Sequence, residues 1–280
     1  MQTRKSLTAL LAFLVVFAAN NVAAQQQPAK GMMEWGIAAG GLSYPAYPAA
    51  TGRKNRALIL PYLKYNSDRF SIGGASLAAV HLGQTEKTRF DFSVAASLDA
   101  SSAGLPIRAG MPDLGYIFEA GPVVEYQMGT AFGGLVEARL PLRAVFTTNL
   151  SSVNLIGATF SPQLRVTWTL NKATRTEIEA TLQPVFATEG VQDYFYQVDP
   201  VYATIPRPAF DAQGGYLGTE IVVKASHSLS PTLRVYGYAK IGLHSGAVNS
   251  ASPLFGANQT VTVGIALRKT LGFWKMGSFW

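Results

Sequence analysis

The chain contains no cysteine, few charged residues and, beyond its first 24 positions, no long apolar run. The absence of cysteine excludes a disulfide framework and any thiolate metal site. Charged residues make up 14% of the chain, below the roughly 25% typical of soluble domains. No later stretch approaches the about 18 apolar residues that indicate a membrane-spanning helix. The composition therefore argues against both a helical membrane protein and an ordinary soluble domain.

The N-terminus has the layout of an export signal. Arg4 and Lys5 supply positive charge, and the apolar stretch Leu7–Ala19 follows. Small residues at Val22 and Ala24 suit a cleavage site before Gln25. An uncleaved anchor is the alternative, but the apolar stretch is short of the about 20 residues that a bilayer span needs. We therefore predict a signal peptide over residues 1–24 and an exported domain over residues 25–280.

What the chain does contain is two-residue alternation, in segment after segment. Between Leu233 and Leu243, apolar and polar or aromatic side chains take turns, which is the period of a β-strand. A soluble protein with so many strands and so few charges would aggregate along its sheet edges. A closed barrel in lipid has no such edges. The sequence thus predicts an all-β transmembrane antiparallel β-barrel, with the terminal aromatics Phe279 and Trp280 as weaker support.

We predict about 12 strands, with 10 as the fallback, most of them near the about 9–14 residues that suit tilted membrane strands. Candidates include Arg69–Leu82, Asn154–Leu170 and Asp193–Val198. Barrels of this kind alternate short turns on one side with long loops on the other. Between residues 73 and 115 the predicted strands do not fit this alternation, because it requires one crossing more or one crossing fewer. The topology of this region therefore stays open.

If the apolar faces meet lipid, charged side chains of both signs line the lumen. The basic ones are Arg89, Arg139, Arg143, Arg165, Lys224, Arg234, Lys240 and Arg268. The acidic ones are Asp91, Asp99, Glu119, Glu125, Glu137, Glu177, Glu179 and Glu220. An ion-selective pore would carry rings of one sign, so we expect these charges to pair and fill a narrow lumen. An open channel remains the alternative.

The sequence offers little for catalysis or metal binding. The three histidines are His81, His227 and His244, and serines flank His227 directly in sequence. Strand neighbours point to opposite faces, so these pairs are not Ser–His dyads. No cluster of histidines and carboxylates has metal-ligand spacing. We therefore predict no catalytic residue, no cofactor and no metal.

Two connections stand out by composition. Residues 52–56 carry three cations, which would suit lipopolysaccharide phosphates or simply form a solvated basic loop. The connection Thr188–Gly215 holds three prolines and the docking candidates Tyr194, Phe195, Tyr196, Tyr202 and Phe210. Such a loop is expected to cap the barrel, to present a binding surface, or to belong to an interfacial aromatic girdle.

Short motifs along the exported chain resemble the MipA/OmpV family of Gram-negative outer-membrane proteins. They occur in order at residues 43–48, 60–65, 69–70, 111–114, 119–122, 194–198, 207–210, 214–216 and 252–254. The resemblance implies a non-enzymatic adaptor that joins a murein lytic transglycosylase to a penicillin-binding protein at the outer membrane. As partners of the barrel itself we expect outer-membrane lipids and lipopolysaccharide, while the scattered charges and export argue against nucleic acid. A narrow porin-like channel for small solutes stays open as the alternative.

Overall fold

A computed structural model describes residues 31–73, 76–96, 104–148 and 151–275. The predicted signal peptide, Asp99 and the terminal Phe279 and Trp280 lie outside these described residues. The signal peptide and the limits of the exported domain therefore stay predictions.

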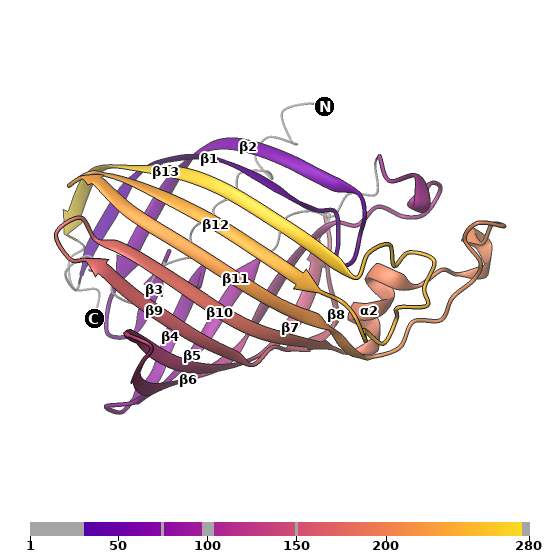
Figure 1. Cartoon of the computed structure of the whole chain (residues 1–280), viewed down its shortest axis with the longest axis horizontal. Coiled ribbons are helices and arrows are strands. Elements are labelled where there is room, and N and C mark those ends of the chain that lie inside the picture. Colours follow the sequence, from indigo (N-terminus) through magenta and orange to yellow (C-terminus); the bar gives the residue numbers. More distant parts are fainter. Residues whose placement is uncertain (1–30, 74–75, 97–103, 149–150, 276–280) are drawn as a thin grey trace.

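The described chain forms one antiparallel sheet that closes on itself. Its strands are β1 Met32–Pro45, β2 Arg53–Asn66, β3 Phe70–Ile72, β4 Ala78–Gln84, β5 Thr88–Ala96, β6 Tyr116–Ala131, β7 Gly134–Thr148, β8 Val153–Phe160, β9 Gln163–Asn171, β10 Thr176–Ala187, β11 Gly215–Ser230, β12 Leu233–Leu243 and β13 Gln259–Lys275. Strands that follow one another along the chain pair with each other, except β8 and β9, and β1 pairs with β13 to close the ring (Figure 1). The predicted all-β antiparallel barrel is confirmed.

Strands β8 and β9 together occupy one strand position in the barrel wall. Both pair with β7 in the same register, from Val145 opposite Gly157 on β8 to Leu135 opposite Thr167 on β9, and the register shifts only between Val145 and Phe146. Only Ser161 and Pro162 separate them, where proline lacks the N–H that a ladder needs. The barrel wall thus has the predicted 12 strand positions, and the predicted strand Asn154–Leu170 consists of two strands that lie end to end.

The prediction of one strand over Arg69–Leu82 is wrong. The chain enters β3, reverses at Gly73 and returns as β4, with Phe70 opposite Val80. Gly73 has φ +66°, and a Cβ there would lie 2.4 Å from the carbonyl oxygen of Leu63, so only glycine fits this reversal. This short hairpin supplies the additional crossing that the alternation of short turns and long loops requires in this region.

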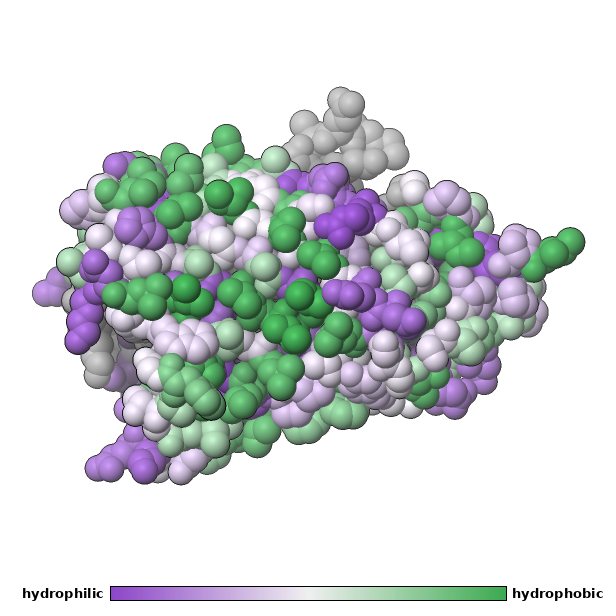
Figure 2. Space-filling view, viewed as in Figure 1, coloured by the Kyte–Doolittle hydropathy of each residue, from purple (hydrophilic) through white to green (hydrophobic). Residues whose placement is uncertain are grey.

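Side chains alternate between a polar inside and an apolar outside. On the outer surface Ile59, Ile265 and Leu164 are 74%, 62% and 45% exposed. On the inner surface Arg139 and Glu179 are 4% and 1% exposed. Apolar side chains gather over the wall of β10 to β13 (Figure 2), the arrangement that lipid requires of a barrel's outer face.

The long connections fold together at one end of the barrel, and the predicted strand Asp193–Val198 is wrong. Most of that segment lies in helix α2, Glu189–Tyr196, beside the short helical turns η1, Pro106–Arg108, and η2, Pro200–Tyr202 (Figure 1). We call residues 46–52, 105–114, 188–214 and 244–258 the cap. No helix among the described residues is long and apolar enough to cross a bilayer.

A hydrophobic core holds the cap on the barrel end. Its fully buried members include Tyr196 and Leu254, with 0% and 1% exposure, packed with Val145 of β7. Helix α2 approaches β8 closely because Gly157 has no side chain. A Cβ there would meet the Thr188 hydroxyl at 2.1 Å.

Candidate functional site

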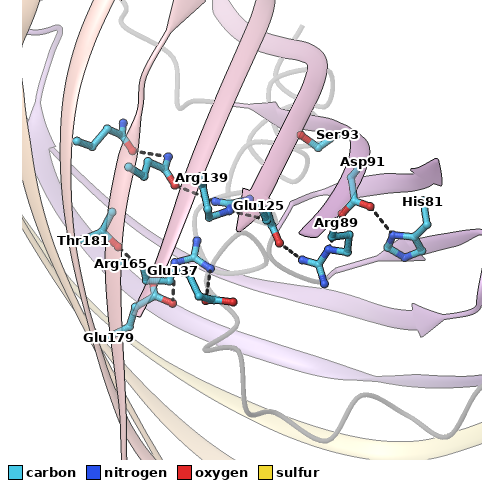
Figure 3. A network of polar contacts seen from close by, with 12 residues as sticks. His81, Arg89, Asp91, Ser93, Glu125, Glu137, Arg139, Arg165, Glu179 and Thr181 are labelled. Carbon is cyan, nitrogen blue, oxygen red and sulfur yellow. Dashed lines mark hydrogen bonds and ion pairs between the residues drawn. The ribbon is translucent and has the colours of Figure 1, made fainter. Parts of the chain in front are cut away.

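A continuous chain of polar contacts crosses the inner wall from β4 to β7. His81 Nδ1 lies 2.8 Å from Asp91 Oδ1, and Arg89 Nε lies 3.0 Å from the other oxygen of the same carboxylate. Arg89 also pairs with Glu125, whose second oxygen accepts from Arg139 Nε at 2.5 Å. The side chains point toward one another across the lumen face of these strands (Figure 3).

Two glutamines extend this chain around the barrel to β12. Arg139 Nη1 donates to Gln163 Oε1 at 2.9 Å, and Gln163 Nε2 donates to Gln183 Oε1 at 2.6 Å. Gln183 then donates to Glu220 at 3.3 Å, and Lys240 Nζ donates to Glu220 at 2.6 Å. One network thus links eight of the 12 strand positions in the wall, from His81 on β4 to Lys240 on β12. We call it, with the pairs described next, the inner belt.

Further ion pairs complete the inner belt. Arg165 reaches Glu179 at 3.5 Å and Glu137 at 3.8 Å, and Lys224 donates to Glu179 at 2.8 Å. The remaining pairs are Arg234 with Glu177 at 2.7 Å, Arg143 with Glu119 at 3.5 Å and Arg268 with Glu34 at 3.5 Å. Every inward acid named here lies within ion-pair distance of a cation.

The structure places the lumen candidates as follows. Buried inside are Glu125, Arg139, Arg165, Glu177, Glu179 and Arg234. Partly buried on the same inner face are Glu119, Glu137, Arg143, Glu220, Lys224 and Lys240. Sequence reasoning missed Glu34, His81 and the neutral links Gln163 and Gln183. Each of them occupies an inward-facing position in the two-residue alternation, and that position was the signal that could have identified them.

Several buried atoms of the inner belt lack a direct protein partner. In the described part of the chain these include Glu137 Oε2, the Thr167 hydroxyl and Nε of Arg165, although the first and last still lie in ion pairs of 3.8 and 3.5 Å. Buried polar atoms of this kind are commonly satisfied by ordered water. The part of the lumen around Arg165 is therefore polar enough to hold water.

The three histidines do not form a hydrolase triad with described residues. His81 has an aspartate partner but no hydroxyl. His227 Nδ1 contacts the Thr176 hydroxyl at 2.8 Å and His244 Nε2 contacts the Thr260 hydroxyl at 3.0 Å, each without a carboxylate in hydrogen-bond contact among the described residues. Nucleophilic catalysis needs a nucleophile, a base and an orienting group in one chain. Within the described residues, no group of three histidines or carboxylates could hold a metal ion.

Hydrogen bonds tie the segments of the cap to one another. Tyr196 donates to the Pro48 carbonyl at 2.9 Å, and Ser252 donates to the Tyr196 carbonyl at 2.8 Å. Tyr47 donates to the Leu254 carbonyl at 2.7 Å. These hydrogen bonds therefore join the connections before β2, before β11 and before β13 to one another.

The aromatic docking candidates divide between the inside and the rim of the cap. Phe195 and Tyr196 are buried, whereas Tyr194, Tyr202 and Phe210 are partly exposed. Burial raises the pKa of Tyr194 to about 12 and also raises that of Tyr196, so both phenols stay neutral donors. The exposed apolar tip is instead Ile205, which is 102% exposed and was not predicted.

His244 joins the cap to the barrel rim. Its Nε2 accepts from the backbone N–H of Ala49 at 3.3 Å, while its Nδ1 lies 3.3 Å from the Leu217 carbonyl. Because a carbonyl only accepts, Nδ1 carries the proton and the ring is neutral. Burial lowers the pKa of His244, in keeping with that state.

Residues 37–271 match the description MltA-interacting protein MipA. The chain belongs to this family. The match covers the barrel from β1 to β13 and confirms the resemblance seen in the sequence. Among curated proteins, none matches the chain.

Solved structures similar to this MipA-family barrel are distant. The NanC porin is 9% identical, with a TM-score of 0.38 over 86% of this chain and 100% of its own. A Pseudomonas aeruginosa FadL homologue is 8% identical, with a TM-score of 0.36 over 96% of both chains. OmpT of Vibrio cholerae is 8% identical, with a TM-score of 0.35 over 91% of this chain and 100% of its own. Likenesses this weak carry nothing about substrate or activity.

Proposed function

We propose that this protein is a non-enzymatic scaffold in the outer membrane of a Gram-negative bacterium. It holds a lytic transglycosylase of the MltA type near the cell wall and, as the sequence resemblance implies, brings it together with a penicillin-binding protein. The observation that carries the proposal is the family match over residues 37–271. A paired inner belt and a packed cap support it, because they leave the outside of the barrel as the part that meets partners.

The short turns supply the surface for such a partner, since these barrels place short turns in the periplasm. The turn between β6 and β7 exposes Phe132 by 88%. Phe132 has φ +55° and the following Gly133 has φ +74°, a turn that favours asparagine rather than a bulky aromatic residue. Trp168 holds the strained backbone by donating to the Phe132 carbonyl at 2.8 Å. An exposed ring kept in an unfavourable conformation is a contact residue for a partner.

Binding of a purified MltA-type transglycosylase to the detergent-solubilised barrel tests the proposal. The wild type is expected to bind, and Phe132→Asn to bind at least about tenfold more weakly while folding as well or better. Ile205→Asn, which changes an apolar tip at the cap end that is even more exposed, is the matched control and should bind normally. Failure of the wild type to bind contradicts the scaffold.

A narrow channel for small solutes is the second candidate. The observation that favours it is the set of buried polar atoms around Arg165 and Thr167 that have no direct hydrogen-bond partner in the described part of the chain, because a polar lining is what a solute pathway needs. In that case the cap is a gate, and the charges of the inner belt line a constriction.

A further inference from the structure

A shallow groove lies over residues 41–43 of β1 on the lipid-facing surface of the barrel. It has a volume of about 640 Å³ and is lined by residues of β1, β2 and β13, among them Gly41, Ser43, Ala57 and Ile265. Strand pairing explains its shape, because Ile265 stands opposite Gly41 and Gly41 stands opposite Ala57. A large side chain is thus followed across the sheet by no side chain and then by a methyl group.

Apolar walls flank this floor. Val263 and Ile265 on β13 are 47% and 62% exposed, and Ile59 on β2 is 74% exposed. Ala39 lies between Leu267 and Ile59 in the next row of the sheet, so small side chains continue along β1. The result is an open trough between two branched ridges, which suits a hydrocarbon chain lying along the wall.

A fixed guanidinium closes the cap-side end of the groove. Arg53, at the start of β2, reaches across β1 to donate from Nη1 to the Val261 carbonyl at 2.7 Å. Its Nη2 donates to the Ser43 hydroxyl at 2.9 Å. These two contacts hold the group in place on the outer surface, where Arg53 itself is exposed.

In the described part of the chain, Arg53 has no ion-pair partner. Both of its acceptors are neutral oxygens, and none of the ion pairs among the described residues includes it. The inward cations Arg139 and Arg234, in contrast, each face a carboxylate. A positioned, unpaired guanidinium is the group that recognises phosphate.

We propose that this groove binds an anionic saccharolipid of the outer leaflet, lipid A, with a phosphate on Arg53 and one acyl chain in the trough. Charge complementarity selects the headgroup end, and the row of Gly41 and Ala57 admits the chain. The long loops place the cap side toward the outer leaflet. Arg53, at the cap-side end of β2, therefore lies at the level of the headgroup phosphates of that leaflet. The site is separate from the short turns and does not depend on the scaffold.

Native mass spectrometry of the purified full-length barrel tests this site by titration with lipid A. Arg53→Gln is expected to weaken binding at least about tenfold, because a charge-assisted contact is lost. Ala57→Leu should weaken it several-fold by filling the trough. The matched controls are Lys269→Gln, an exposed cation at the opposite rim, and Ala225→Leu, an exposed small residue on β11. Heat-modifiable gel mobility verifies that each variant is folded.

Two comparison lipids complete the experiment. Lipid A without its phosphates should bind the wild type no better than phosphorylated lipid A binds Arg53→Gln. Phosphatidylglycerol should bind weakly and without dependence on Arg53. Equal binding of lipid A by wild type, Arg53→Gln and Ala57→Leu overturns the site. Phosphatidylglycerol binding as tightly as lipid A, with the same dependence on Arg53, overturns the assignment to the saccharolipid.

Discussion

The imidazole of His244 accepts a hydrogen bond from the backbone N–H of Ala49, which lies 195 positions earlier in the chain. The contact joins the connection before β2 to the rim above β12, and the Ala49 carbonyl accepts in turn from Gly256 and Ala257 at 2.9 Å each. Thr260, Phe255 and the charged pair Glu220 and Lys240 surround the ring. A protonated ring would turn a second N–H toward that of Ala49, so acid should weaken this joint.

The first prediction is a pH-dependent cap. Burial lowers the pKa of His244 when the cap is closed, so its contribution to closure is complete above about pH 6.5. That contribution is lost as the pH falls through the lowered pKa. We expect the hydrogen-exchange protection of the Ala49 amide to fall between about pH 7.5 and pH 5, while an amide within β11 keeps its protection.

The control for this prediction is His244→Gln, whose amide oxygen can accept from Ala49 without titrating. In this variant the protection of Ala49 should no longer depend on pH. Equal protection of the wild type at both pH values would show that His244 does not hold the cap.

The strands were predictable because lipid and lumen impose opposite chemistry on alternate residues. The inward and outward sides of β11 and β12 follow from the sequence alone. The hairpin of β3 and β4 was not predictable, because Gly73 interrupts the alternation only by its close approach to Leu63 on another strand. Contacts distant in sequence decided that topology.

In the cap and the inner belt, too, the contacts between residues that are distant in sequence could not be predicted. Aromatic and proline content predicted a folded connection, but helix α2 is stabilised by a core that draws on Leu254 and Val145, far away in the chain. In the inner belt, the charged side chains followed from alternation. The glutamines Gln163 and Gln183, which connect them, carry no charge, so their inward position in the alternation was the signal that could have identified them.

The second prediction concerns which side of β9 meets lipid. Val166 and Leu164 point outward, while Thr167 is buried inside, 5% exposed. Val166→Arg should cost about 2–4 kcal/mol of barrel stability because it puts a charge into lipid. Thr167→Arg, its inward neighbour, should cost clearly less. Heat-modifiable gel mobility after refolding measures both, and equal yields would contradict the facing of this strand.

The third prediction concerns the compensation of charge inside the inner belt. Arg139→Met removes the buried partner of Glu125 and should destabilise the barrel by about 3–5 kcal/mol. Arg89→Met, which removes the other and more exposed partner of Glu125, should cost less. Urea titration of both refolded variants makes the comparison. A larger loss for Arg89→Met would mean that the inner belt is not held together at Arg139.

The fourth prediction concerns the core of the cap. Tyr196 is fully buried and joins α2 to Pro48, so Tyr196→Ala should destabilise closure of the cap by about 3–5 kcal/mol. Limited proteolysis should then cut the connection between β10 and β11, while gel mobility reports an intact barrel. Tyr202→Ala, at a half-exposed position of the same connection, is the control and should stay resistant.

Single-channel conductance of the wild-type barrel in a planar bilayer tests the central claim most directly, because a scaffold with a paired inner belt and a packed cap needs no open pore. At neutral pH we expect a closed baseline with at most rare, small and weakly selective openings. Deletion of Gln192–Phe210, which removes most of α2 and the core residue Tyr196, should raise the conductance. A large and steady conductance of the unmodified protein would contradict the account and favour the solute channel.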